Sequence, residues 1–462
     1  MHIRINAAFA YLITLSLIFF IFRLYNATDI SYWMDELYSS TRANPNKEIK
    51  DVIIWGPDPH PPLHYLILWS SYKFFGFSEI AGRLISIIAG TLIIPAIFYL
   101  SKQLFSERTA FFASFFASIN PFLIYYSTEV RSYELLCLFS IFSTYLFIRL
   151  DSYDFKRLSF LVAYFFINLV LINLHFFGVL TVLGQFIFLI LVKNRKISSL
   201  VRFTAINIIA FSSYFFLINL ILSILESGPS WIQQVSFNTY IFETFNSFIF
   251  NQYIFDHSAQ TVVGAFLVVC FVSGIILISK RDKKEESILI MCMIFSIIIT
   301  PIFIGLILHP LFTSRNAIGA LPFLLLVYAF LFDELSKRVS RKIVLTSLLL
   351  VSVISFVYYK EVPKQEWRES LKYASTLSDQ IYVPHWPRQW ETYASWLSIK
   401  DVEIKDLKLL NKTDHNIDKK VVVAWAQLKP EEFERLSETI KDLELVSKKN
   451  FIDSGIYIYT FK

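Results

Sequence analysis

The chain has 462 residues, of which 55% are hydrophobic, 17% aromatic and only 17% charged. Soluble globular proteins carry about 25% charged residues. The composition therefore excludes a soluble globular protein and indicates an integral membrane protein. The formal net charge of +6 reflects basic loops between apolar segments, so it reports orientation in a membrane and gives no sign of a nucleic-acid partner.

A helix needs ~20 residues to cross a ~30 Å hydrocarbon layer. Apolar runs near this length recur along the chain. We count about eleven on that criterion, at residues 7–25, 84–100, 110–126, 135–150, 160–175, 176–192, 203–225, 261–279, 287–308, 317–332 and 343–359. The first lacks a small-residue cleavage site and reads as an uncleaved helix. All three cysteines fall inside these runs, which argues against disulfides or a thiolate metal site. We expect a polytopic α-helical membrane protein.

Basic residues occupy alternate connections between the runs, for example Lys102 and Arg108, and later Lys193 and Arg195. By the positive-inside rule these connections face the cytoplasm. The other connections, including residues 26–82 and the tail after Tyr359, are then expected to face outward from the cytoplasmic membrane, so a site in them would also face outward.

Two outward connections are long. In residues 26–82, an aromatic-rich amphipathic pattern from Leu63 to Phe75 predicts an interfacial helix. Residues 226–258 carry aromatic side chains, Trp231 and Tyr253 among them, and no Lys or Arg. This second loop is typical of a lid or a lipid-facing cover.

The composition changes after Tyr359, where the residues become charged and helix-like patterns alternate with strand-like ones. The pattern predicts a small α/β domain over residues 360–462, following a membrane domain over residues 1–359 that includes both long loops. The segments lie at Glu366–Leu377, Gln380–Val383, Arg388–Leu397, Lys420–Trp425, Glu431–Ile440, Leu443–Lys448 and Gly455–Phe461.

An acidic pair, Asp35 and Glu36, follows the first apolar run directly. Carboxylates held against apolar surroundings are costly to keep ionised, so the pair is a candidate for general-base or metal-ligand work. The alternative is structural, because acids are also common at the first turn of a helix.

Charged residues also gather where outward connections meet the membrane. Glu129 and Arg131 follow one run, Arg315 precedes another, and Arg83 begins the second run. Any one of these arginines can be explained by snorkelling. Three on the outward side, with acids close in sequence, predict an anionic ligand such as a lipid phosphate, which guanidinium groups grip bidentately.

Three histidines, His60, His64 and His175, are placed on the same side. The spacing of His60 and His64, with Asp35 or Glu36 nearby in space, is compatible with a metal site. The alternatives are that His60 orients the loop or binds a sugar hydroxyl and that His175 caps a helix end. A divalent cation is thus possible, and the sequence does not determine whether one is used.

A series of short motifs resembles the GT-C glycosyltransferases, specifically the bacterial branch of glycosyltransferase family 39 related to protein O-mannosyltransferases and lipid A aminoarabinose transferase. The motifs run Trp33-x-Asp35-Glu36, His60-Pro61-Pro62-Leu63-x-Tyr65, Phe75-Gly76-x-Ser78-Glu79-x-Ala81-x-Arg83-Leu84, Tyr125-Tyr126-Ser127-x-Glu129-x-Arg131-x-Tyr133, His175-Phe176-Phe177, Arg315 before Ala320-Leu321-Pro322, and Glu366-Trp367-Arg368. Asn316 departs from the pattern, since the family often has tyrosine there.

The resemblance implies an inverting transfer of a sugar from a polyprenyl-phosphate donor, held among membrane lipids, to a glycan, lipid or protein acceptor. The expected roles are Asp35 as general base, with Glu36 and Glu129 orienting it or the acceptor. Arg131, Arg315 and Arg83 are expected to bind the donor phosphate, and His60, His64, Tyr126 and His175 to contact substrate. The alternatives are a lipid-linked sugar flippase or transporter, which would place charges near the midplane in repeated halves, and an inactive scaffold of the same fold.

Overall fold

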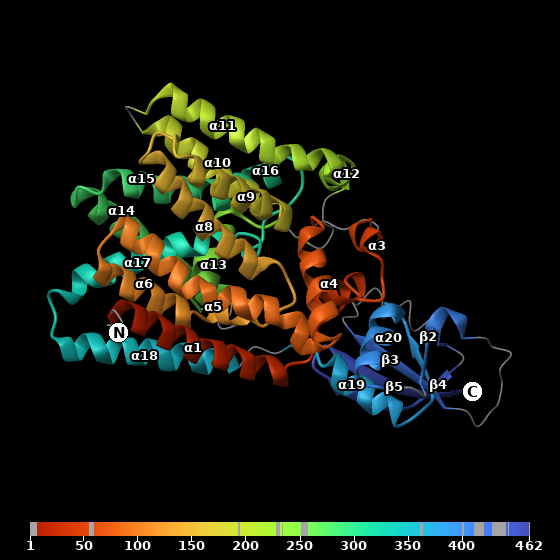
Figure 1. Cartoon of the computed structure of the whole chain (residues 1–462). Coiled ribbons are helices and arrows are strands. Elements are labelled where there is room, and N and C mark those ends of the chain that lie inside the picture. Colours follow the sequence, from red (N-terminus) through yellow and green to blue (C-terminus); the bar gives the residue numbers. More distant parts are fainter. Residues whose placement is uncertain are drawn as a thin grey trace, which may run out of the picture. The chain divides into compact units, whose positions relative to one another are not determined.

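The computed structural model describes residues 7–54, 60–192, 195–227, 232, 234–250, 257–360, 364–399, 402–410, 420–426, 440–441 and 443–461. The chain divides into two compact parts (Figure 1). The helical part comprises Met1–Leu24, Trp55–His64 and Ile85–Val362. The loop-tail part comprises Tyr25–Ile54, Tyr65–Leu84 and Pro363–Lys462. Most of the first long loop therefore groups with the C-terminal tail.

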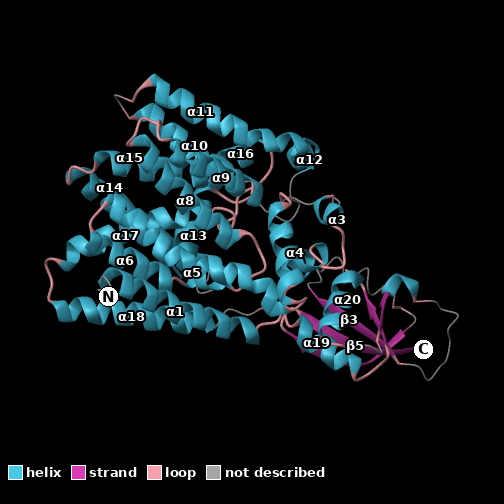
Figure 2. Cartoon of the chain, in the orientation of Figure 1, coloured by secondary structure: helices cyan, strands magenta, loops and turns pink. Residues whose placement is uncertain are grey.

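The helical part is built from long apolar helices that lie roughly alongside one another (Figures 1 and 2). Its elements are α1 (Ala7–Asp29), α5 (Glu79–Leu104), α6 (Glu107–Ile119), α7 (Pro121–Ser127), α8 (Tyr133–Asp151), α9 (Leu158–Leu174), α10 (Gly178–Leu191), α11 (Ile197–Phe211), α12 (Ile218–Ser227), α13 (Phe237–Phe250), α14 (His257–Lys280), α15 (Lys284–Ile294), α16 (Thr300–Ile307), α17 (Leu321–Ser336) and α18 (Arg341–Lys360). A π-helical segment, Phe295–Ile299, joins α15 to α16. α1 and α5 each continue into the loop-tail part.

Within the described residues, seven helical stretches are long and apolar enough to cross a membrane, and α6 with α7 makes an eighth if that bent pair is one span. The seven are Ala7–Thr28, Glu79–Leu104, Tyr133–Asp151, Ile197–Leu222, Ser258–Lys280, Lys284–Ile307 and Ile318–Ser336. The predicted fold class, a polytopic helical membrane protein, is confirmed. The hydropathy pattern predicted about eleven spans because it counts apolar runs, whereas α9 and α10 are shorter helices of 17 and 14 residues.

The bend between α6 and α7 has a local cause. Asn120 ends α6, and its side chain accepts a hydrogen bond of 2.9 Å from the backbone N–H of Leu123. Pro121 is the first residue of α7, where its missing N–H costs nothing. The two helices meet at 54°, and α7 ends just before the turn that carries Glu129 and Arg131.

Buried polar side chains join the helices α8 to α11. Ser143 donates to Asn168 Oδ1 at 2.6 Å, Asn168 Nδ2 donates to Asn207 Oδ1 at 2.9 Å, and Gln185 Nε2 donates to Ser143 at 2.9 Å. Hydrogen bonds between helices stabilise packing in a membrane, where apolar side chains gain little by leaving lipid. The network fixes how these four helices pack around one another.

The loop-tail part contains α2 (Met34–Arg42), α3 (Ile49–Ile53), most of α4 (Leu63–Phe75), and a mixed sheet with two helices (Figure 2). The strands β1 (Gln380–Val383), β2 (Glu403–Asp406), β3 (Val421–Ala426), β4 (Leu443–Phe451) and β5 (Ser454–Phe461) are ordered β2-β1-β3-β5-β4. β1 pairs in parallel with β2 and β3, and β5 pairs antiparallel with β3 and β4. The predicted α/β tail is confirmed.

The helices of this sheet are α19 (Trp367–Ser375) and α20 (Pro387–Trp396). Trp367 and Trp390 stack with ring centroids 4.5 Å apart, and both are almost completely buried. Burying a large aromatic side chain contributes about 1.5 to 3 kcal/mol, so this pair anchors the two helices. The predicted segment Glu431–Ile440 falls mostly outside the described residues, as do Trp231 and Tyr253 of the predicted lid.

Candidate active site

The acidic pair lies in the first turn of α2, in the loop-tail part. Asp35 is partly exposed, and Glu36 is completely buried. The carboxylate of Glu36 accepts a hydrogen bond of 3.3 Å from the backbone N–H of Trp33, the residue before the helix. A carboxylate in the first turn is stabilised by the helix dipole. The two acids therefore differ, with Glu36 bonded inside the protein and Asp35 on a rigid helix start with access to solvent.

Arg83, at the start of α5, forms a bidentate ion pair with Glu36. Its Nε lies 3.1 Å from Glu36 Oε1 and its Nη2 lies 3.1 Å from Oε2, and neither side chain is exposed. The remaining N–H groups donate to the carbonyl oxygens of Ala27 at 2.7 Å, Ile30 at 2.6 Å and Ser31 at 3.2 Å. These bonds use all five N–H donors of the guanidinium group. In this arrangement Arg83 has none left for a donor phosphate.

A cluster of cationic and imidazole side chains lies in the helical part, which we call the cationic cluster: His60, His175, Arg131 and Arg315 around Tyr133. Arg131 Nη2 is 3.3 Å from His60 Nε2, and the rings of His60 and His175 are 5.2 Å apart. The guanidinium groups of Arg131 and Arg315 lie 5.9 and 5.8 Å from the centre of the Tyr133 ring. The structure thus brings together four residues predicted to contact the donor or its sugar.

His175 follows α9 and is held as a neutral imidazole. Burial lowers its pKa well below the ordinary value, and the neighbouring His60, Arg131 and Arg315 side chains lower it further. Its Nδ1 accepts a hydrogen bond of 3.2 Å from the backbone N–H of Phe177. The proton of the neutral ring is therefore on Nε2, and this buried group has no hydrogen-bond partner among the described residues.

The other predicted substrate contacts surround the same turn. Tyr126, in α7, is buried with its ring 5.2 Å from that of Tyr133. Glu129 is completely buried, and its backbone N–H donates to the carbonyl oxygen of Tyr126 at 3.2 Å. His64 is buried near the start of α4 and adds to the positive surroundings of His175.

The described part of the chain brings no three His, Cys, Asp or Glu side chains together as a metal site would require. His60 lies near His175 and Arg131. The spacing of His60 and His64 is not accompanied by a carboxylate ligand set in the described residues. Asn316, the departure from the family pattern, donates to the carbonyl oxygen of Leu311 at 3.5 Å.

Sequence reasoning missed two buried ionisable side chains in the helical part. Arg23 of α1 and Glu134 of α8 are both completely buried, and Arg23 Nε donates to Ser127 at 3.1 Å. Both lie next to Gly90, where an added Cβ atom would be 3.2 Å from Arg23 Nε and 3.3 Å from Glu134 Oε2. A charged residue inside an apolar run is costly and is usually paired or functional, so the sequence did carry a signal for Arg23.

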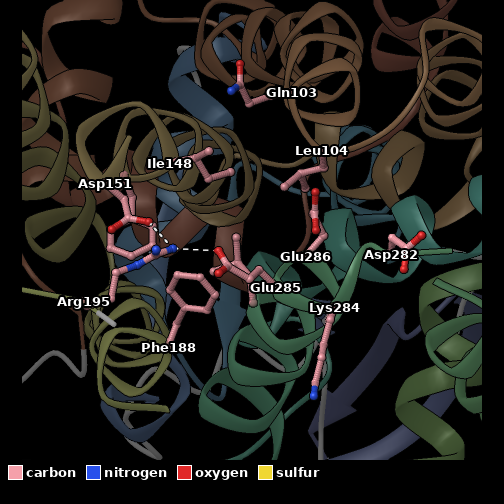
Figure 3. A pocket seen from close by; sticks show the side chains of 12 residues that line it. Gln103, Leu104, Ile148, Asp151, Phe188, Arg195, Asp282, Lys284, Glu285 and Glu286 are labelled. Carbon is pink, nitrogen blue, oxygen red and sulfur yellow. Dashed lines mark hydrogen bonds and ion pairs between the residues drawn. The ribbon is translucent and has the colours of Figure 1, made fainter. Parts of the chain in front are cut away.

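A polar cavity of about 430 Å³ lies at the other end of α8 from Tyr133. In Figure 3 the guanidinium group of Arg195 lies between the carboxylates of Asp151 and Glu285, at 2.7 and 2.8 Å. This cavity lies at the end of α8 where the basic connections are, so it is separate from the cationic cluster around Tyr133.

The comparisons with known proteins agree with this architecture. Residues 59–221 match the family model described as dolichyl-phosphate-mannose-protein mannosyltransferase. No curated protein matches the sequence significantly. Two solved structures of ArnT from Cupriavidus metallidurans match along the chain. The apo state has a TM-score of 0.65 at 12% identity over 98% of both chains, and the form bound to undecaprenyl phosphate has a TM-score of 0.63 at 12% identity over 97% of both.

The oligosaccharyltransferase of Archaeoglobus fulgidus, in complex with zinc and sulfate, matches with a TM-score of 0.54 at 13% identity, over 94% of this chain and 71% of that one. At such identities these structures establish a shared fold. The family match covers residues 59–221 of the chain, and the fold shared with ArnT extends over almost its whole length.

Proposed function

We propose that this protein transfers a sugar, with inversion, from a polyprenyl-phosphate donor to a glycan, lipid or protein acceptor at the outer face of the cytoplasmic membrane. The observation that carries the proposal is the cationic cluster, in which two arginines accompany a neutral histidine with a buried, unbonded Nε2–H. An unsatisfied buried donor costs about 1 to 3 kcal/mol. A phosphate or sugar oxygen would satisfy it.

The cluster suits a leaving phosphate. As the bond between the anomeric carbon and the phosphate oxygen breaks, its electron pair adds negative charge to the phosphate. Arg131 and Arg315 would stabilise that charge, since preorganised cations act most strongly where charge develops. His175 would donate a hydrogen bond through Nε2 without adding a charge that must be desolvated.

Asp35 is the residue we assign as general base. The acceptor hydroxyl forms the new bond to the anomeric carbon while its proton moves to the carboxylate of Asp35. Asp35 suits this role better than Glu36, because Glu36 is already bonded to Arg83 and to the backbone of Trp33. We propose that Arg83 acts on the donor only indirectly, by fixing the segment that carries Asp35.

The test is a deletion strain complemented with variants. Lipid-linked sugars extracted from parental membranes serve as the donor, and the unmodified envelope fraction of the deletion strain serves as the acceptor. We expect Asp35→Asn to insert and to bind undecaprenyl phosphate like the parent, yet to lose transfer by ~10²-fold or more. Near-parental transfer by Asp35→Asn would remove this residue from the chemistry and make Glu129 the next candidate base.

The same strains test the alternative of a lipid-linked sugar transporter. A glycosyltransferase should release undecaprenyl phosphate and modify the envelope fraction in detergent, where no membrane separates two compartments. A transporter has no activity in detergent. Absence of transfer in detergent, combined with accumulation of the lipid-linked sugar in one leaflet of the deletion strain, would therefore overturn the enzyme assignment.

A further inference from the structure

The backbone just before Asp35 is held by hydrogen bonds from the tail. The hydroxyl of Tyr393, in α20, accepts a hydrogen bond of 2.6 Å from the backbone N–H of Tyr32 and lies 3.0 Å from Ser31 Oγ. It also donates to the carboxylate of Glu79. Burial raises the pKa of Tyr393 well above its ordinary value, and the charge of Glu79 raises it further. The hydroxyl therefore stays protonated and keeps these bonds.

A second tail residue bonds to the first turn of α2. Gln365 Oε1 accepts hydrogen bonds from the backbone N–H of Met34 at 3.1 Å and from Trp367 Nε1 at 2.9 Å. Met34 is the first residue of α2 and the neighbour of Asp35. The first N–H groups of a helix have no partner within the helix, so Gln365 supplies a bond that the segment cannot make for itself.

Side chains on both sides complete this attachment. The backbone N–H of Arg368 donates to Ser31 Oγ at 3.1 Å, and the Arg368 guanidinium pairs with Glu79 at 3.1 Å. Farther along α2, Thr41 and Thr392 are joined by a hydrogen bond of 3.1 Å. The helix carrying Asp35 is thus bonded to the tail before, at and after its first turn.

We infer that the C-terminal tail positions the general base, with Tyr393 and Gln365 as positioning residues that fix the backbone from Ser31 to Met34 and so the carboxylate of Asp35. The inference rests on the proposed role of Asp35. Neither residue touches the reacting atoms in this scheme. Their effect is on geometry, because a catalytic group displaced by a fraction of an ångström loses much of its rate advantage.

Three substitutions test the inference in the full-length protein. Tyr393→Phe removes only the hydroxyl, and Gln365→Met removes the acceptor oxygen at similar length. Gln365→Glu restores an oxygen that can accept the same bonds. Tyr373→Phe is the matched control, because it removes a hydroxyl from α19 in the same domain.

Two readouts are needed. The first is deuterium exchange of the peptide containing Tyr32 and Met34. We expect it to speed up by roughly ten-fold in Tyr393→Phe and Gln365→Met, since each variant loses a hydrogen bond to a backbone N–H of this segment. The second is transfer kinetics, in which kcat should fall by roughly ten-fold or more while the KM for the extracted lipid-linked donor stays within about two-fold. Gln365→Glu should approach parental values in both.

The outcomes separate this inference from the proposed function. Unchanged exchange at Tyr32 and Met34, or faster exchange with parental kcat, would overturn the positioning role. A fall in kcat that Gln365→Glu does not reverse, or that Tyr373→Phe reproduces, would overturn it as well. Asp35→Asn is assayed alongside. If it alone loses transfer, the base assignment stands and the positioning role fails, whereas near-parental transfer by Asp35→Asn removes both.

Discussion

Substitutions in the ion pair of Glu36 and Arg83 test most directly whether Arg83 has a structural role or binds a ligand. Replacing Arg83 with methionine keeps an unbranched side chain but removes the guanidinium group. The Glu36 carboxylate would then be buried without its bidentate partner, and the carbonyl oxygens of Ala27, Ile30 and Ser31 would each lose a hydrogen bond. Both charged side chains are completely inaccessible to solvent, so water cannot replace the lost contacts.

Removing one partner of a buried ion pair costs about 3 to 5 kcal/mol, which for a domain of this size lowers the unfolding temperature by roughly 10 °C. We expect Arg83→Met to lower the unfolding temperature by about that amount, and Glu36→Gln to lower it as well. The double variant Arg83→Met/Glu36→Leu should be less destabilised than the sum of the single changes, because it leaves no unpaired charge. Arg281→Met is the control, since its partner Glu334 lies 2.7 Å away at an exposed site, where ion pairs contribute only about 0 to 1 kcal/mol.

Thermal unfolding of the detergent-purified variants gives the stability term, and titration with undecaprenyl phosphate below the unfolding temperature gives the binding term. The structure predicts a large loss of stability, with undecaprenyl phosphate affinity close to parental in the protein that remains folded. The reverse pattern, an unchanged unfolding temperature with affinity reduced ten-fold, would refute the structural role and return Arg83 to the phosphate-binding residues.

Two further predictions concern the phosphate and the membrane orientation. Arg131→Ala and Arg315→Ala should each weaken undecaprenyl phosphate binding by about ten-fold or more, because a charge-assisted hydrogen bond contributes about 1.5 to 3 kcal/mol. Arg149→Ala, at the other end of α8, is the control and should bind like the parent. Equal affinity in all three variants would mean that Arg131 and Arg315 only extend toward the membrane surface and do not bind the phosphate. Single cysteines at Asn46 and Glu444, both exposed, should react with a membrane-impermeant maleimide in intact spheroplasts; labelling only after permeabilisation would reverse the orientation.

Local sequence pattern was sufficient for the fold class. Apolar runs near the length of a bilayer crossing determine that the chain is a helical membrane protein, because lipid satisfies no backbone hydrogen bonds and a helix satisfies its own. The same periodicity located β1, β3 and α20 in the tail. It did not give the number of spans, since the break at Asn120 and Pro121 and the short helix α10 depend on where each helix ends.

The candidate site divides in the same way. Motif order pointed to the residues that the structure gathers in the cationic cluster, and the sequence alone showed that Asp35 follows the first apolar run. The sequence could not decide that Glu36 and Arg83 bind each other, because they are 47 positions apart. Nor could it show that Tyr393 reaches the backbone of Tyr32, which lies 361 positions earlier. Hydropathy and helix periodicity are properties of neighbours in the chain, whereas the partner of a buried charge or N–H group is set by how distant segments pack, and only the tertiary structure decides that.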